Sequence, residues 1–465
     1  MSVLRTGLAG FLLAVAPLAQ TASGPDVRIR ILDREAPSEV RVEATEGPIR
    51  IVADGIERAT AQRGEVVTLT RSNGDVRARF GGADVSARSL RLNAEGFRLR
   101  AGRVDRQYPG ALAARVAGGR LELVNHAPIE PYVASVVQSE FGFPVLEGAK
   151  AQAVLARTYA LRRAGDHPTY DVEDDHRSQV YRGLSGTSDV SRRAAYETAG
   201  EVLTYFGTLA DATYFSSSGG HTADNDKVWA GDPIPYLRGV PDPYDDASPD
   251  HTWRTTAARS AVHGALTRQY GGRVEGVEVL RRSRSNRVLE IRLVGGRRST
   301  ITGADFRRVV NAAIGARTVR STRFTVRAEG DRYVFDGGGY GHGVGLSQYG
   351  ALGQARAGRD YRQILSFYFA GTAVTPTGDP LAPPALVASV NGPEAGVPAA
   401  AIPREPASAL RTRYRPVTAR RWPTPRHVAR QQAADADAAP MPPIPPRPPA
   451  TPAPEEAPQA RRTAW

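Results

Sequence analysis

The residues best suited to do chemistry lie between positions 132 and 161, in YVASVVQSEFGFPVLEGAKAQAVLARTYAL. Glu140 is a lone acid at the end of one predicted helix. After a break marked by a glycine and a proline, a second predicted helix carries Lys150, Gln152 and Arg157. A carboxyl at a helix C-terminus faces the negative end of the helix dipole, and partial burial raises its pKa further. Such a group starts protonated near neutral pH, as general acid catalysis requires.

Two cations of the second predicted helix share one face, because positions three and four apart are neighbours: Lys150, Val154 and Arg157 follow that spacing. The chain has 61 Lys plus Arg, yet Lys150 and Lys227 are its only lysines. An ammonium differs from a guanidinium in size, hydration and ease of pKa shift. We expect Lys150 and Arg157 to face negative charge on a ligand, since contact with Glu140 would lower its pKa. The alternative is a helical hairpin with its polar face in water.

A second candidate region is the polar turn SSSGGHT, residues 216–222, at the end of a predicted strand. Small residues at a strand end let the backbone approach a ligand closely. Its candidate ligand-binding residues are Ser217, Ser218, His221 and Thr222. A serine with His221 and Asp224 could form a hydrolase triad, but the chain has no G-x-S-x-G nucleophile elbow.

A third region, residues 335–372, is rich in glycine but matches neither G-x-G-x-x-G nor G-x-x-x-x-G-K-[ST], so it does not favour nucleotide binding. His342 lies between two glycines, where a core role is hard to explain. Ser347 and Gln348 open a predicted helix. All three are candidate ligand-binding residues.

The loop YDVEDDHRSQVYRG, residues 170–183, gathers four acids around His176. Such a cluster could bind a divalent cation, although a solvated loop is the more common outcome. A metal-dependent hydrolase using this loop and His221 is therefore a weaker hypothesis, and we predict no metal and no cofactor.

The composition excludes several classes of function and indicates where the protein is located. The 465-residue chain has no cysteine, which excludes disulfides and thiolate metal sites. Residues 1–23 carry Arg5, a short apolar run and small residues, a pattern typical of a secretory signal peptide and too short for a stable membrane span. The protein is thus expected in the periplasm or cell envelope. Its net charge of +13 is spread thinly, so no nucleic acid partner is expected, and attraction to an anionic envelope explains it as well.

The hydrophobic pattern predicts an α+β fold. Short runs with period-two alternation, from Val27 to about Asn125, indicate a small antiparallel β domain, assigned to residues 24–107. A mixed α/β core follows over residues 108–372, including strand-like runs that surround a helix near 304–313. Residues 373–465 are rich in proline, alanine and arginine, which predicts a disordered tail.

Taken together, these motifs resemble the SpoIID/LytB family, the sporulation stage II protein D transglycosylases and amidase enhancers. The matching blocks are IEPYVASVVQSE, AKAQAVLARTYAL, YDV with QVYRG, YFSSSGGHT, PYLRGV, and GYGHGVGLSQYGALGQARAG with ILSFYFAGT. They occur in family order across roughly residues 108–372. The resemblance implies an enzyme that cleaves the bond between N-acetylmuramic acid and N-acetylglucosamine, leaving a 1,6-anhydro end, preferably on peptide-stripped strands.

By the same resemblance, Glu140 is the catalytic acid. Patterned family positions map onto Lys150, Gln152, Arg157, His221, His342 and Gln348. Some sporulation members hold zinc through two cysteines, but this chain has Glu173 and Ser178 at those places, so the zinc site is expected to be lost. A single carboxyl suits this reaction, whereas ordinary glycosidases normally need two.

Two functional classes follow from the resemblance. In the first the chain is the transglycosylase, with peptidoglycan glycan strands as substrate. In the second it is a non-catalytic module that holds glycan strands and stimulates a partner, a cell-wall amidase, and Glu140 is only a polar contact.

Overall fold

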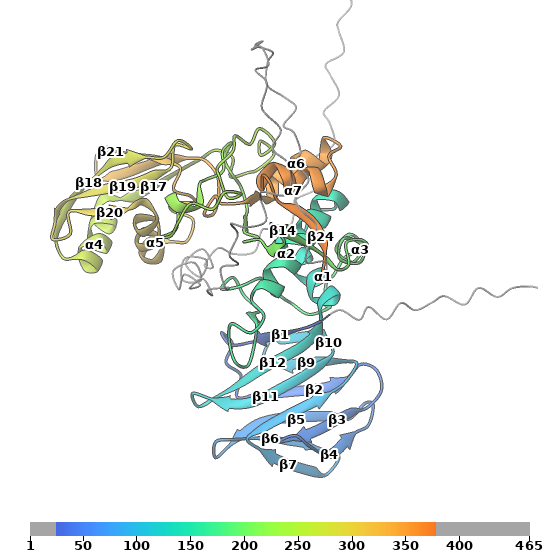
Figure 1. The fold of residues 1–465 in the computed structure, drawn as a ribbon. Helices are drawn as coiled ribbons and strands as arrows, with labels where there is room; N and C mark the ends of the chain where they lie inside the picture. The colour runs from blue at the N-terminus through green and yellow to red at the C-terminus, as the bar shows by residue number, and fades with distance from the viewer. Residues whose placement is uncertain (1–24, 378–465) are drawn as a thin grey trace, which may run out of the picture.

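The computed structural model describes residues 25–377, which form an α+β fold, as predicted (Figure 1). The expected signal peptide lies outside the described residues, as does the expected tail from residue 378 onward. The first tail positions are an exception. Residues Ala373–Pro376 form strand β24, because they pair antiparallel with β14 (Glu201–Tyr205) and bury Thr375.

The N-terminal part consists of two β-sheets that share one hydrophobic core. The seven-stranded sheet has, in spatial order, β13 (Val172–Glu173), β1 (Asp26–Ile31), β12 (Arg120–Pro128), β11 (Ala111–Ala117), β8 (Ser89–Asn93), β3 (Ile49–Ala53) and β4 (Ile56–Ala61). The six-stranded sheet has β10 (Val104–Pro109), β9 (Gly96–Ala101), β2 (Glu39–Ala44), β5 (Val66–Ser72), β6 (Asp75–Phe80) and β7 (Ala83–Ala87).

The alternating pattern explains these sheets. In β2, for example, Val40 and Val42 are buried while Glu39 and Arg41 are exposed, as a strand with one face on a core requires. All pairings among β1 to β12 are antiparallel, and the short β13 adds to β1 in parallel. The sheet continues through β11 and β12 to Pro128, so strands from both sides of position 107 belong to it.

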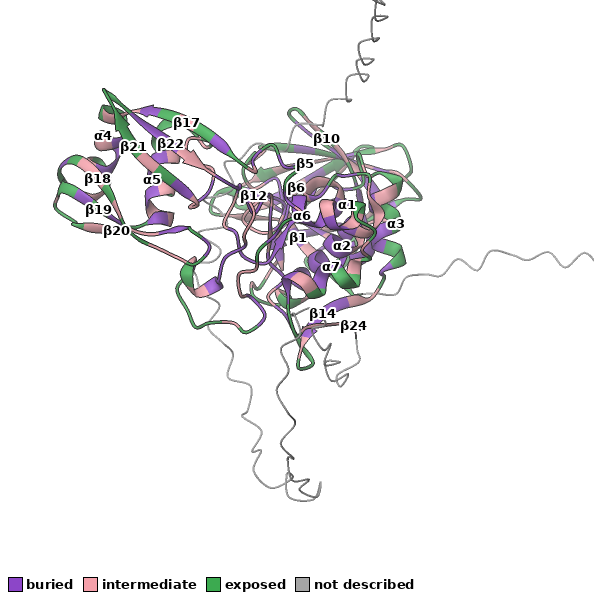
Figure 2. Cartoon of the chain, turned by 90° about the horizontal axis from the view of Figure 1, so that it is seen from above, coloured by how far each residue is buried: buried purple, intermediate pink, exposed green. Residues whose placement is uncertain are grey.

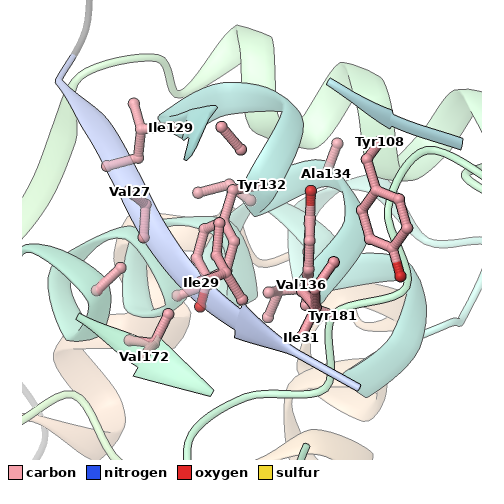
Figure 3. Packing of buried hydrophobic residues seen from close by; sticks show 14 of the residues in the cluster. Val27, Ile29, Ile31, Tyr108, Ile129, Tyr132, Ala134, Val136, Val172 and Tyr181 are labelled. Atoms are coloured by element: carbon pink, nitrogen blue, oxygen red, sulfur yellow. The ribbon is translucent and has the colours of Figure 1, made fainter. Parts of the chain in front are cut away.

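Helices α1 (Ile129–Glu140) and α2 (Leu146–Arg162) follow directly, which confirms the predicted helical pair. Figure 3 shows Ile29 of β1 packed near Tyr132 of α1 and Tyr181, whose rings are 5.3 Å apart. The helical part and the β-sheets thus share one core. Around the pair lie α3 (Asp189–Glu197), β14, β15 (Thr208–Leu209), β16 (Tyr214–Phe215), β23 (Leu346–Ser347), α6 (Gln348–Arg356) and α7 (Tyr361–Tyr368).

A second lobe extends to one side of the molecule (Figures 1 and 2). It contains β17 (Trp253–Ala258), α4 (Arg259–Tyr270), β18 (Gly272–Arg282), β19 (Val288–Gly296), β20 (Thr300–Thr302), α5 (Gly303–Ile314), β21 (Phe324–Glu329) and β22 (Arg332–Gly337). Stacked and tilted rings of Phe306, Phe324 and Phe335 lie in its own hydrophobic cluster. The predicted helix near 304–313 is α5, but the sequence pattern did not separate this lobe from the rest of the core. Between residues 25 and 377, no helix has the length and apolar run that a membrane span needs.

Candidate active site

Glu140 is the last residue of α1, which ends because Gly142 adopts a left-handed conformation, with φ of 60°. The half-buried carboxyl accepts a hydrogen bond of 2.8 Å from the Val180 N–H. Desolvation raises the pKa of Glu140 to about 7, although the Val180 bond and the charge of Arg182 act in the opposite direction. The acid is therefore balanced between its protonated and ionised forms near neutral pH.

Tyr132 of α1 and Tyr214 of β16 are joined through the Gln179 side chain. Tyr132 of α1 donates a hydrogen bond of 2.8 Å to the Gln179 side-chain oxygen, and the Gln179 amide donates to the Tyr214 hydroxyl at 3.1 Å. Burial, and then the charge of Glu140, raises the pKa of Tyr214 well above its usual range. Tyr214 therefore stays neutral and lies within electrostatic reach of the acid.

His342 is tied to the same strand. Its Nε2–H donates to the Tyr214 carbonyl at 3.0 Å, and the Val344 N–H donates to Nδ1 at 3.1 Å. These bonds fix the neutral ring with its proton on Nε2. The ring lies near Phe215 and Trp229, with centroids 5.4 and 5.0 Å away. Tyr214, on the strand that leads into the polar turn, thus lies near both Glu140 at the end of α1 and the glycine-flanked histidine, positions that are far apart in the sequence.

The polar turn, residues 216–222, is called the serine turn below. Asp245, a carboxylate with no exposed surface, accepts hydrogen bonds from it. Both of its oxygens accept hydrogen bonds, from the Ser217 and Ser347 hydroxyls and the Ser218 and Gly219 N–H groups, at 2.8 to 2.9 Å. Because Ser217, Ser218 and Ser347 are fully buried, this network fixes the backbone of the turn.

We expect Asp245→Asn to lower the free energy of unfolding by about 2–4 kcal/mol, because an amide cannot accept all four bonds and places its own donor against the N–H groups. Urea denaturation measures this change. The matched control is Asp246→Asn at the exposed neighbouring position, which should leave stability nearly unchanged. Equal stability of both variants would contradict the assigned role of Asp245.

The other predicted binding residues of these two regions are placed as follows. His221 is half-buried, and its Nδ1–H donates to the Thr222 carbonyl at 2.7 Å. Thr222 is buried, where its hydroxyl accepts from the Val240 N–H. Gln348 is buried at the start of α6, and Ser347 caps that helix by accepting from the Gly350 N–H. Contact between any of these residues and a ligand stays a prediction.

The two predicted cations of α2 do not face Glu140. Arg157 has no exposed side-chain surface and pairs with the buried Glu130, with 3.1 Å from its Nε to Oε1. It also donates to the Ala195 and Glu201 carbonyls. The expectation that Arg157 faces a ligand does not match this position, since its donors already hold α1, α3 and β14 together.

Lys150 and Gln152 also lie apart from the acid. The Lys150 ammonium contacts the carboxylates of Glu147 and Glu197 at 3.1 and 2.8 Å. Gln152 is buried, and neither atom of its amide has a hydrogen-bond partner within the described part of the chain. Neither side chain is placed to change the pKa of Glu140.

The acidic loop is neutralised by arginines rather than gathered around a cation. Asp171 pairs with Arg28 at 2.6 Å, and Glu173 pairs with Arg30 and Arg177. At the second family cysteine position, the Ser178 hydroxyl accepts from the Glu173 N–H. These two positions therefore do not fit a zinc ion, and across residues 25–377 no group of three or more His, Asp or Glu side chains is placed to hold a metal.

Four contributors to the site escaped the sequence analysis: Gln179, Arg182, Tyr214 and Asp245. The first three belong to motifs quoted above, but their types carry no spacing signal for the roles they have here. Asp245 lies in a run of prolines and acidic residues that is typical of an exposed turn. Only the fold shows that its side chain points inward.

The raised pKa of Glu140 predicts that the free energy of unfolding depends on pH. The protonated form is favoured in the folded protein, whereas an unfolded glutamic acid ionises near its ordinary pKa of 4.5. The folded state therefore binds more protons between pH 4.5 and about 7, and stability falls as pH rises through that window. We expect Glu140→Gln, which keeps the acceptor for Val180, to stabilise the protein by roughly 2–3 kcal/mol at pH 8.

Thermal unfolding of the variant and wild type across pH measures this effect. The two melting temperatures should converge at pH 4, where both proteins carry a neutral group. A constant difference at all pH values would show that burial of the charge is not its cause.

The fold and site define a two-lobed α+β protein whose candidate centre is one glutamic acid at a helix end. Its sequence matches the family model SpoIID, described as stage II sporulation protein, over residues 117–205, and a domain of unknown function, DUF8618, over residues 244–345. The chain belongs to the SpoIID family. The DUF8618 match covers most of the second lobe, from before β17 to just beyond β22.

Three relatives illustrate the match. An amidase enhancer of Bacillus subtilis (strain 168) is 31% identical over 277 residues, covering 50% of this chain but only 38% of that protein. Stage II sporulation protein D of the same organism is 28% identical over 273 residues, 54% of this chain and 76% of that protein. An uncharacterized protein of Brachyspira hyodysenteriae is 32% identical over 283 residues, 58% of this chain and 72% of that protein.

Proposed function

We propose that the chain is a peptidoglycan lytic transglycosylase that cleaves the bond between N-acetylmuramic acid and N-acetylglucosamine. The observation that carries this proposal is the position of Glu140: a half-buried acid with a pKa of about 7, held by one backbone N–H at a helix end. A single carboxyl group is sufficient for this reaction, because a lytic transglycosylase can use the same group first as acid and then as base.

In this mechanism, protonated Glu140 donates its proton to the glycosidic oxygen as the bond to the muramic C1 breaks. The resulting carboxylate then removes the proton from the C6 hydroxyl of the same sugar, whose oxygen attacks C1 and closes the 1,6-anhydro ring. One group thus serves as acid and then as base, and it ends the cycle protonated. A pKa near neutrality suits both half-reactions.

Incubation of the purified protein with peptide-free glycan strands tests the proposal. Mass spectrometry should detect 1,6-anhydromuramic ends that accumulate with time. Reducing ends without the anhydro ring would indicate hydrolysis instead, and absence of any new ends would remove the enzyme from consideration.

A second candidate function is supported by the relative named amidase enhancer. In this alternative the chain holds glycan strands and stimulates a cell-wall amidase without cleaving the strand itself. Both functions place the protein outside the cytoplasm, in the periplasm or cell envelope. Amidase activity measured with and without the protein, using a Glu140→Gln variant that makes no anhydro ends, separates stimulation from cleavage.

A further inference from the structure

An arginine of the second lobe reaches the serine turn of the main lobe. Arg323 immediately precedes β21, and its Nη1 lies 3.7 Å from the place a Cβ would occupy on Gly220 and 3.0 Å from that place on Gly338. His251 borders the same point, 3.8 Å from the Gly220 position. The guanidinium therefore packs against glycine backbone, and a side chain on Gly338 would crowd its Nη1.

The Arg323 guanidinium has no ion-pair partner among residues 25–377. Burial lowers the pKa of Arg323, and the negative charge of Asp245 acts in the opposite direction. Both oxygens of Asp245 already accept hydrogen bonds, from the serine turn and from Ser347. Over residues 25–377 the Arg323 guanidinium makes no hydrogen bond or ion pair, and its Nε is buried without a partner.

Nearby arginines differ in this respect. Arg317 and Arg320, from the same connection between α5 and β21, both pair with the buried carboxylate of Asp250. A partly desolvated guanidinium without such a partner is costly unless an anion binds it. Its planar fork of donors matches a carboxylate in particular.

We propose that Arg323 binds the free lactyl carboxylate of a muramic acid residue in a peptide-stripped glycan strand. This inference rests on the proposed glycan substrate and assigns a specificity role to the second lobe. The lactyl carbon carries a carboxylate only after the peptide has been removed, because it is otherwise the carbonyl of an amide. Arg323 would thus distinguish stripped from peptide-bearing muramic acid at a position separate from Glu140.

Binding measured in the Glu140→Gln background tests this role, since the strands are then not consumed. The probes are peptide-free strands with their carboxylates intact and the same strands converted to carboxamides. Protein with Arg323 should bind the carboxylate form about tenfold to a hundredfold more tightly. Arg323→Gln should bind both forms alike. The matched control is Arg273→Gln on β18, whose side chain is 90% exposed and which should keep the full preference.

The outcomes separate this inference from the proposed reaction. If Arg323→Gln keeps the carboxylate preference, or if neither probe binds, the assignment of Arg323 is wrong. Equal loss of preference in the Arg273→Gln control would also overturn it, because general charge attraction would then explain binding. If the wild type forms no anhydro ends while the preference still depends on Arg323, the inference holds and the transglycosylase proposal fails.

Discussion

Replacing Glu140 by glutamine is expected to reduce the formation of 1,6-anhydromuramic ends by about 10²- to 10⁴-fold, the usual contribution of a positioned general acid or base. An amide can neither give a proton to the glycosidic oxygen nor take one from the C6 hydroxyl. The substitution keeps the size of the side chain and an oxygen for the Val180 N–H, so the end of α1 should not change. Mass spectrometry of peptide-free strands after timed incubation measures the loss.

The matched control is Glu147→Gln, because Glu147 lies in the first turn of α2 and pairs with Lys150 rather than with the candidate site. This variant should retain wild-type activity. Binding of glycan strands by Glu140→Gln should persist, which separates loss of chemistry from loss of substrate. Undiminished product from Glu140→Gln would show that Glu140 is not the catalytic acid, whereas no product from the wild type would leave the enhancer as the better description of the protein.

Much of the fold could be predicted from local patterns. Alternation in runs such as EVRVEA predicted antiparallel strands, and the break marked by a glycine and a proline after Glu140 predicted the helical pair. Both signals are local, because each depends on a few neighbouring residues. The lobe carrying α4 and α5 was not separated, since its strands and helices have the same periodicity as the core on either side, and periodicity does not state which core an element joins.

The candidate site was predicted only in part. The end of α1 and the glycine-flanked His342 were identified by unusual residue types in unusual places, and the structure connects them through Tyr214. Asp245 was missed because the sequence alone does not state whether an aspartate side chain is buried or exposed. Its role depends on four donors brought from distant segments, and the same reasoning applies to the unpartnered guanidinium of Arg323.

Arg157 shows the opposite case, a residue whose family pattern indicates a binding role but whose surroundings indicate a structural one. We expect Arg157→Met to lower the free energy of unfolding by about 3–5 kcal/mol, because it leaves Glu130 buried, at 3% exposure, without its counterion. The Ala195 and Glu201 carbonyls also lose a donor. Urea denaturation followed by circular dichroism measures the change.

Two further variants decide between the structural and the binding role. Lys150→Met removes a cation about two turns earlier in the same helix that is more accessible to solvent, and should cost less than about 1 kcal/mol. Combining Arg157→Met with Glu130→Gln should recover part of the lost stability, since no unpaired buried charge remains, and the double-mutant cycle isolates that coupling. If Arg157→Met instead leaves the free energy of unfolding unchanged and abolishes binding of glycan strands, that result would contradict the structural role of the Arg157–Glu130 pair. It would mean that Arg157 contacts the ligand in a different conformation.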